Sequence, residues 1–337
     1  MKNLFLITIV FFLALSFLST SAKIWVVDSN PGNLAKDFAT LQTAHDDASV
    51  LIGDTLYLSG SAIGYGNLTA TKTLHIFGPG YFLNENDSTQ ANVNEAIVGK
   101  IIFQSGSDGS SILGCSINYS ATATIEIYAN NIKFKRNKIH RGDWDYAVVI
   151  SNGRSNILFI QNYIDCDRYI ISIQQYASNI IFSNNFIQST INYAIISSHS
   201  TCENIVLENN IFYGDLSLSN ASIINNILRS GSYSGTNNNI QYNICNSTQF
   251  PNDGTNQVNV NMGTVFLGNG STDGQWQLAP GSPAIGTGSN GTDIGMFGGD
   301  NPYTLSGIPP IPAIYEFLGS STGSQFLPVQ AKIKSRN

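Results

Sequence analysis

Charged residues are scarce in this chain of 337 residues, since Asp, Glu, Lys and Arg together make up 11% of it. The 22 acidic residues outnumber the 16 basic ones, and the formal net charge at pH 7 is −6. A protein that neutralises many phosphates needs a surplus of basic residues. The composition therefore argues against a general nucleic-acid-binding protein, and we expect no nucleic acid among the partners.

Long apolar runs are absent after residue 18. The chain begins with Met1 and Lys2, continues with an apolar run over residues 4–18 and then reads Thr20-Ser21-Ala22. This order predicts a secretory signal peptide over residues 1–22. The run is too short to span a bilayer, and Lys23 stands where a lipoprotein has cysteine. We expect an exported, soluble monomer, secreted or at the cell surface, with no membrane span after cleavage.

One asparagine phrase recurs six times against this weakly charged background. Each phrase consists of Asn, five residues, a second Asn, one residue and an apolar side chain. Successive phrases start 25, 23, 25, 16 and 17 residues apart, which predicts a short unit wound into a stack. The pairs are Asn131/Asn137, Asn156/Asn162, Asn179/Asn185, Asn204/Asn210, Asn220/Asn226 and Asn237/Asn243.

Each phrase predicts a short strand, a turn and another strand. In the first phrase Ile132 and Phe134 alternate with polar neighbours, as in a half-buried strand. We expect the second Asn at the turn, because Asn tolerates the left-handed conformation. Stacked coils then place successive amides about 4.8 Å apart, where they can bond one another and the turn backbone. The asparagines are therefore predicted to be structural.

Two solenoids use an asparagine in this way. The leucine-rich repeat also places Asn after an alternating strand, but steps of 16 and 17 residues are too short for its strand and helix. Segments such as 147–150, 170–173 and 194–197 are rich in Ile and Val, which favours a third strand in each coil. The predicted fold is an all-β parallel β-helix, with earlier coils around residues 73–77, 101–103 and 109–117.

The four cysteines of an exported chain suggest a disulfide framework, but the repeat argues against it. Cys115 and Cys245 would lie six coils apart, about 29 Å at the strand spacing. A disulfide requires Cα atoms within roughly 4.4–6.8 Å. Cys166 and Cys202 fall at unlike points of their coils. We therefore expect buried free thiols.

The two ends differ from the repeat. Phe38, Leu41, Ala44 and Ala48 fall at helical spacing, which predicts an amphipathic helix that covers the open end of the stack. His45 and the two aspartates after it are then expected to face solvent. The stretch after residue 280 is rich in turn residues and proline. We predict a β-helix domain over residues 23–300 and a cap or tail over residues 301–337.

Both ends carry a resemblance to a known family. The opening Phe38-x-Thr40-Leu41-Gln42-x-Ala44 with Gly53-Asp54-Thr55-Leu56-Tyr57 resembles the N-terminal cap of pectin-lyase-like right-handed β-helix proteins. The asparagine columns are similar to the asparagine ladder of that superfamily. The segments 280–286 (PGSPAIG) and 293–299 (DIGMFGG) resemble the final coil of many secreted bacterial members. The resemblance implies the fold and its right-handedness, whereas activities vary within the superfamily.

Catalytic motifs of one branch are absent. Polygalacturonase-type members carry Asn-Thr-Asp, Asp-Asp, His-Gly and Arg-Ile-Lys segments, and here the one Asp-Asp pair is Asp46-Asp47 in the predicted cap helix. Hydrolysis by paired carboxylates is therefore not expected. Lyase-type members need a cation to neutralise the substrate carboxylate and a basic residue to remove the adjacent proton.

One segment offers such groups, because seven of the 15 basic residues after the signal fall within residues 133–168. The stacking frame places His140 beside Asp165, Asp143 beside Arg168 and Trp144 beside Tyr169, at about the strand spacing. We expect His140, Arg141 and Arg168 as candidate acid/base residues and Asp143, Asp165 and Asp167 as candidate Ca²⁺ ligands. The candidate substrate-binding residues are Lys133, Lys135, Arg136, Lys138, Trp144 and Tyr169.

Three functions fit these observations. The first is a secreted, non-catalytic protein whose surface contacts an anionic polysaccharide. The second is a polysaccharide lyase that acts by β-elimination on uronate-containing glycans. The third is a purely structural or adhesive surface protein, in which the charged segment forms solvated ion pairs of little energetic value. The sequence leaves all three open.

Overall fold

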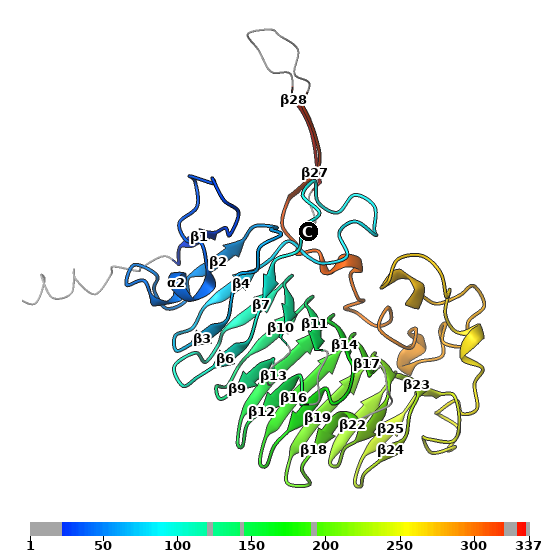
Figure 1. Cartoon of the computed structure of the whole chain (residues 1–337). Coiled ribbons are helices and arrows are strands. Elements are labelled where there is room, and N and C mark those ends of the chain that lie inside the picture. Colours follow the sequence, from blue (N-terminus) through cyan, green and yellow to red (C-terminus); the bar gives the residue numbers. More distant parts are fainter. Residues whose placement is uncertain (1–21, 120–123, 142–144, 190–193, 320–328, 335–337) are drawn as a thin grey trace, which may run out of the picture.

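The computed structural model describes residues 22–119, 124–141, 145–189, 194–319 and 329–334. Three parallel sheets run the length of a stack of coils (Figure 1). Each regular coil adds one strand to each sheet, in the order sheet A, sheet C, sheet B. The predicted right-handed parallel β-helix is therefore confirmed, and the leucine-rich alternative is wrong.

The strands of each sheet follow the order of the coils. Sheet A has ten strands: β1 (Ile24–Val27), β2 (Thr55–Leu58), β4 (His75–Phe77), β7 (Ser111–Leu113), β10 (Lys133–Lys135), β13 (Ser155–Ile160), β16 (Ser178–Ser183), β19 (Glu203–Glu208), β22 (Ala221–Ile224) and β25 (Asn239–Gln241). Sheet B has eight: β3 (Leu68–Ala70), β6 (Ile101–Phe103), β9 (Ile125–Ile127), β12 (Val148–Ile150), β15 (Ile171–Ile173), β18 (Ala194–Ser198), β21 (Asp215–Ser217) and β24 (Tyr233–Ser234). Sheet C also has eight: β5 (Ile97–Val98), β8 (Ser116–Asn118), β11 (Lys138–Arg141), β14 (Tyr163–Cys166), β17 (Phe186–Ser189), β20 (Ile211–Tyr213), β23 (Ile227–Ser230) and β26 (Ile244–Cys245).

Alternation along these strands fills the interior with one apolar row per position. Phe134, Phe159 and Phe182 are in register on neighbouring strands and are fully buried. Their rings stack with centroids 4.8 and 5.0 Å apart. Parallel stacking of like side chains follows from the strand spacing of about 4.8 Å. The core thus consists of columns of apolar side chains, each formed by equivalent positions of successive phrases.

The second asparagines of the phrases form a hydrogen-bonded column inside the turn from sheet A to sheet C. Asn185 is typical: its Nδ2 donates to Phe159 O at 2.8 Å and to Asn210 Oδ1 at 2.9 Å. Its Oδ1 accepts from the backbone N–H and the Nδ2 of Asn162. We call this set the buried asparagine column; its members are Asn137, Asn162, Asn185, Asn210, Asn226, Asn243 and Asn256.

The left-handed positions differ from the prediction. The second asparagines have ordinary backbone conformations, whereas the first ones, such as Asn156 with φ of 60°, are left-handed. The residue before the second asparagine of each phrase, such as Asn184 with φ of 56°, is left-handed as well. The buried amide is thus free to bond along the stack, because its neighbour makes the turn. We call the first asparagines (Asn131, Asn156, Asn179, Asn204, Asn220 and Asn237) the outer asparagine column.

The earliest coils correct a second detail. The segments 73–77 and 101–103 were expected to lie in different coils, but β4, β5 and β6 follow one another around a single coil. A loop over residues 78–96 separates the first two of these strands. Ile112 lies in the column of Phe134 as expected, and the Cys115 N–H donates to Asn137 Oδ1.

A short helix, α2 (Leu41–Asp46), covers the first end of the stack. Thr40 and Thr43 form a capping box at its start, which satisfies two backbone donors. Leu41 and Ala44 are fully buried against the core, whereas Ala48 lies beyond the helix and is exposed. The predicted cap therefore exists but is shorter than the apolar spacing indicated.

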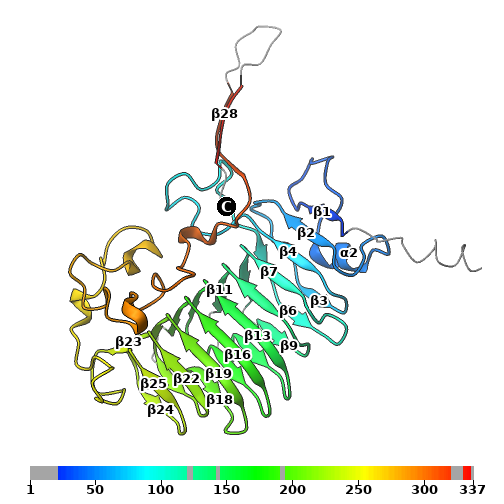
Figure 2. The same ribbon diagram turned by 180° about the vertical axis from the view of Figure 1, so that it is seen from behind.

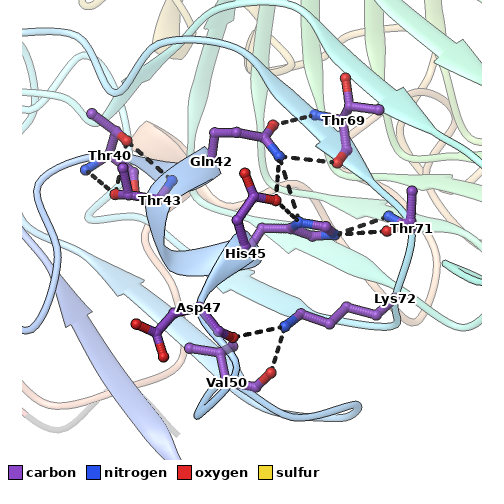
Figure 3. A network of polar contacts seen from close by, with 10 residues as sticks. Thr40, Gln42, Thr43, His45, Asp47, Val50, Thr69, Thr71 and Lys72 are labelled. Atoms are coloured by element: carbon purple, nitrogen blue, oxygen red, sulfur yellow. Dashed lines mark hydrogen bonds and ion pairs between the residues drawn. The ribbon is translucent and has the colours of Figure 1, made fainter.

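Figure 3 shows how this helix closes the free edge of sheet B. Gln42 Oε1 accepts from the Thr69 N–H at 2.8 Å, and His45 Nε2 accepts from the Thr71 N–H at 3.0 Å. His45 Nδ1 donates to Asp46 Oδ1 at 2.7 Å, and this bond, followed by that of Gln42, lowers the pKa of Asp46. Side chains thus replace the missing strand at the β3 edge. The expectation that His45 faces solvent is wrong, although Asp46 and Asp47 do.

The chain turns back after β26, the last strand of the three sheets. Residues 246–312, which we call the return segment, carry four short 3₁₀ helices: η1 (Met262–Thr264), η2 (Gly274–Trp276), η3 (Ser289–Gly291) and η4 (Leu305–Gly307). Phe250 packs into the main core at its start. The segment, yellow to orange, lies along one side of the stack (Figures 1 and 2). It buries outer side chains of sheet C, including Tyr163, Phe186 and Ile211.

The return segment is tied to the left-handed corner residues. Asn184 Nδ2 donates to Met296 O and Gly298 O, at 3.0 and 2.8 Å. Asn225, which belongs to a later coil, donates to Ser289. Gln161 and Arg136, which belong to earlier coils, donate to backbone carbonyls further along the return segment; the partner of Arg136 is Ile308 O. The segment therefore runs antiparallel to the progress of the coils. Residues 280–299, which resembled a final coil, add no strand to the three sheets and form part of this outer covering.

A hairpin of β27 (Ala313–Gly319) and β28 (Val329–Lys334) follows and projects away from the stack (Figure 1). The four cysteines are buried and free, as predicted. Burial raises the pKa of the Cys115 and Cys166 thiols far above the ordinary value, so both stay protonated. The predicted signal peptide lies outside the described residues, apart from Ala22. Within the described ranges no helix has the length and apolarity of a membrane span.

Replacing Asn185 by Ala tests the buried asparagine column. The change removes, in a buried site, the side-chain partner of the Phe159 carbonyl and of the Asn162 backbone N–H. Because each buried unsatisfied group costs about 1–3 kcal/mol, we expect the free energy of unfolding to fall by about 3 kcal/mol. Urea denaturation measures it. The control is Asn179→Gly on the same coil, which keeps a left-handed residue in the outer column; equal losses for both variants would contradict the role of the buried column.

Candidate functional site

The basic residues predicted to form one patch lie on different faces of the stack. Lys133 and Lys135 are in β10 and point outward from sheet A, with Lys133 exposed and Lys135 half-buried. Burial, together with the neighbouring charges of Arg136 and Lys133, lowers the pKa of Lys135. These two lysines are the part of the predicted patch that faces outward on sheet A.

Arg136 and Lys138 are held by contacts within the protein. Arg136 Nε donates to Gln161 Oε1 at 2.8 Å, and its Nη1 donates to Ile308 O at 2.7 Å. Lys138 Nζ lies 3.3 Å from both carboxylate oxygens of Glu95 and 4.8 Å from the centre of the Phe82 ring. Both side chains therefore fasten loops to the stack.

His140 and Asp165 are neighbours in register on β11 and β14, as the frame predicted. The contact is between His140 Nδ1 and the backbone carbonyl of Asp165, at 2.7 Å, so Nδ1 donates this hydrogen bond. Burial raises the pKa of Asp165; the charge of His140 lowers it and that of Asp167 raises it. One oxygen of Asp165, Oδ1, is buried without a hydrogen-bond partner among the described residues.

Arg141 lies inside the coil. It follows the outward-facing His140 in β11, so the alternation of the strand turns it inward, and it is 1% exposed. Its Nε and Nη1 atoms have no hydrogen-bond partner among the described residues. In this position Arg141 cannot contact a glycan at the surface, as the predicted acid/base role requires.

The remaining predicted residues gather near the turn from sheet C to sheet B. Asp167, Arg168 and Tyr169 are half-buried there. The Tyr169 ring centre lies 5.2 Å from that of Tyr146. Asp143 and Trp144, predicted as partners of Arg168 and Tyr169, lie outside the described residues, so those two pairings stay predictions.

Two of the three predicted calcium ligands, Asp165 and Asp167, lie among the described residues. Asp165 is the last residue but one of β14, and Asp167 follows two positions later, close enough for its charge to raise the pKa of Asp165. Ca²⁺ takes six to eight oxygen ligands. Within the described ranges no group of three His, Cys, Asp or Glu side chains could hold a metal ion. The described part alone therefore does not complete a calcium site.

An open groove lies on the outer face of sheet A, beside the outer asparagine column. Its volume is about 580 Å³. Leu158 and Ile181, half-buried neighbours on β13 and β16, form its apolar centre. The lining contains Lys133 and His75 but no Asp or Glu, and consists of His75, Gly109, Ser111, Asn131, Lys133, Asn156, Leu158, Asn179 and Ile181.

The asparagines along this groove form a regular row. Asn156 Nδ2 donates to Asn131 Oδ1 at 3.0 Å, and Asn179 Nδ2 donates to Asn156 Oδ1 at 3.2 Å. Asn204 continues the row at 2.6 Å. Each amide has two N–H groups and two acceptor positions, so a member of the row keeps hydrogen-bonding capacity for solvent or a ligand. The row repeats at about 4.8 Å, the spacing of the strands.

Sequence reasoning located the coils of this groove but missed most of its residues. The phrase marked Asn131, Asn156 and Asn179, and Lys133 was predicted to bind substrate. Leu158 and Ile181 were overlooked, although both stand one position before the buried phenylalanine of their phrase, where a strand faces outward. That alternation was the available signal.

Another open hollow, of about 460 Å³, lies over the end of sheet B. Ser172, Ser197 and His199 are among its lining residues, which include no Lys, Arg, Asp or Glu. A surface of this kind suits neutral polar ligands, and His199 is its single titratable group. It contains none of the residues predicted from the sequence.

The fold and these surfaces define a parallel β-helix with polar and apolar rows along its outer faces. The chain is similar to the crystal structure of pectate lyase Pel9A, with a TM-score of 0.53 and 13% sequence identity; the match covers 82% of this chain and 96% of that one. No protein-family model and no curated protein sequence matches the chain. At this identity the likeness shows the fold.

Replacing Asp165 by Asn tests the charge balance near β14. Because the pKa of Asp165 is raised in the fold, its ionised form is less favourable there than in the unfolded chain, and this cost appears as pH rises through the folded pKa. We expect Asp165→Asn to raise the melting temperature at pH 7. The gain vanishes below about pH 3.9, where the carboxyl is protonated in both states.

Thermal denaturation over this pH range measures the effect, with Asp215→Asn as the control for removal of one negative charge elsewhere. A variant that is less stable than the wild type at pH 7 would contradict the expected sign. The same scans with added Ca²⁺ test the calcium prediction, which requires a stabilisation of the wild type that Asp165→Asn loses.

Proposed function

We propose that the protein is a secreted, non-catalytic β-helix that binds an extended acidic polysaccharide along the groove of sheet A. The observation that carries the proposal is the row formed by Asn131, Asn156 and Asn179 beside Lys133, with no carboxylate in the lining. A polymer with regularly spaced hydroxyl groups can meet one amide per coil. An acidic polymer gains from the cation and from the absence of opposing negative charge.

The shape and chemistry of the groove support a chain rather than a small molecule. Glycan sites combine apolar contacts with a few oriented polar groups. Leu158 and Ile181 supply the apolar contact, while the asparagine amides supply donors and acceptors. The groove is open and follows the coil axis through β10, β13 and β16. A ligand that extends along this axis therefore gains contacts with each coil it crosses.

The described residues supply few groups for catalysis at this groove. His75 and Lys133 are its titratable side chains. Arg141 is buried in the coil, and His140 lies on sheet C. The name of the similar structure, a pectate lyase, suggests uronate-containing chains as ligands, and β-elimination remains the alternative function, with His140 Nε2 and Arg168 as the candidate acid/base groups.

Adding a negative charge at the groove centre tests the proposal. Leu158→Asp places a carboxylate between the asparagine row and Ile181, where it repels an acidic chain. We expect at least about tenfold weaker binding of polygalacturonate, alginate or a glycosaminoglycan, whichever the wild type retains. Lys133→Gln should weaken binding and reduce its salt dependence. Affinity electrophoresis in gels that contain each glycan measures retention.

Two controls match these changes in charge. Ser217→Asp adds the same charge to an exposed position of sheet B, and Lys334→Gln removes an exposed lysine from β28. Both should be retained like the wild type. Equal retention of Leu158→Asp and Ser217→Asp would show that the groove does not bind the glycan.

Ultraviolet absorbance of the same glycans, with and without Ca²⁺, separates binding from cleavage. β-Elimination creates an unsaturated product that absorbs, so a steady rise would contradict the non-catalytic proposal. If the rise depends on His140 or Arg168 and survives Leu158→Asp, the alternative lyase function is the correct one.

A further inference from the structure

A second hollow lies on another face, between the end of sheet C and the return segment. Its volume is about 440 Å³. Tyr213 and Arg229 come from β20 and β23, and the return segment supplies Asn246 and the turn around η1. The remaining lining residues are Ser230, Val260, Asn261, Met262 and Gly263. None of these residues was predicted to be functional.

Arg229 is held by aromatic rings at this hollow. Its guanidinium carbon lies 4.6 Å from the centre of the Tyr213 ring and 5.3 Å from that of Trp276. Trp276 is fixed in turn by Phe186 and Phe266, with ring centres 4.7 and 5.4 Å away. Ring contacts of this kind orient a guanidinium without using its N–H donors.

Those donors have no partner within the described ranges, where Arg229 forms no hydrogen bond or ion pair. A guanidinium offers five N–H groups in a planar fork, which matches the two oxygens of a carboxylate. The half-buried Arg229 is therefore a positioned cation at the wall of a hollow, in a protein whose net charge is −6.

The amides around the hollow also present donors. The side-chain oxygen of Asn261 accepts from the Gly263 N–H at 3.0 Å, and that of Asn246 accepts from Gln249 Nε2. Their NH₂ groups form no hydrogen bond with the described residues. The lining contains no carboxylate, and the half-buried Val260 and Met262 provide an apolar surface. The hollow thus combines a cation and donors with an apolar wall.

We propose that this hollow is a binding site for the carboxylate of a sugar acid, with Arg229 paired to the carboxylate and the sugar ring against Val260 and Met262. A planar carboxylate fits the guanidinium fork in a bidentate pair. A sulfate ester shares the negative charge but presents its oxygens tetrahedrally. The site lies on sheet C and the groove on sheet A, so this proposal holds whether or not the groove binds a glycan.

Calorimetric titration of the full chain with trigalacturonate tests the site. Arg229→Gln removes the charge and the fork while retaining a polar side chain of similar length. We expect at least tenfold weaker binding, since a lost charge-assisted pair is worth about that factor or more. Arg229→Lys keeps the charge but not the fork and should bind less tightly than the wild type. Arg154→Gln, which removes a guanidinium bonded to the backbone carbonyls of Asn152 and Tyr128, should bind like the wild type.

Trp276 reports the location of the ligand. Tryptophan fluorescence should change on titration of the wild type, and Trp276→Phe, which keeps a ring beside Arg229 but removes this fluorophore, should lose that change. Unaltered affinity in Arg229→Gln would overturn the proposal, as would a fluorescence change that persists in Trp276→Phe. Trigalacturonate that binds no more tightly than its carboxyl-reduced or sulfated counterpart would overturn the assignment to a carboxylate. Loss of affinity in Leu158→Asp or Lys133→Gln, with Arg229→Gln unaffected, would place the trisaccharide in the groove instead.

Discussion

The buried asparagine column is the interaction on which the rest of this structure depends. A typical amide, that of Asn185, bonds a turn N–H and a strand carbonyl of the coil before it and the amide of the coil after it. A polar side chain inside an apolar stack is tolerated because these groups satisfy one another. The column holds coils of unequal length, with steps between 13 and 25 residues, at one strand spacing. Loops can therefore vary while the three sheets stay in register.

Because this spacing is constant, a residue type that recurs once per coil forms a continuous row along the outside of the stack. The left-handed asparagines outside sheet A form the outer column because each stands six residues before a buried one. The residues directly before the buried column, such as Gln161 and Asn184, form a corner row that holds the return segment. That segment covers much of sheet C and builds the Arg229 hollow against it. Sheet A keeps its open groove, so the two proposed glycan sites lie on faces that the same repeat has arranged.

The sequence predicted the elements that obey the repeat. The phrase gave the strands, the stacked Phe134, Phe159 and Phe182, and the neighbours His140 and Asp165. It misplaced the left-handed turn by one position, because both Asn184 and Asn185 suit a turn and only the bonding of the buried amide separates them. Asn256, which continues the column, escaped notice since no first asparagine precedes it at the usual distance.

Features that depend on long-range folding were beyond the sequence. The alternation within β11, by contrast, was a local signal: it turns Arg141 inward, although His140 before it faces outward. His45 looked like a solvated residue, yet it closes the β3 edge by accepting from the backbone of Thr71. Nothing local to residues 246–312 shows that they lie across sheet C, so the pairing of Arg229 with Trp276 could not be inferred. Seven nearby basic residues thus suggested one patch, while the fold distributes them over several faces.

The most direct test of the central claim is a crystal structure of the protein with a bound acidic oligosaccharide. The claim is that the coil spacing set by the buried asparagines creates a glycan-binding row on sheet A. It predicts a sugar chain that follows the coil axis past Asn131, Asn156 and Asn179, with an acidic group near Lys133. A chain bound across sheet B, or one that leaves the groove empty, would contradict it.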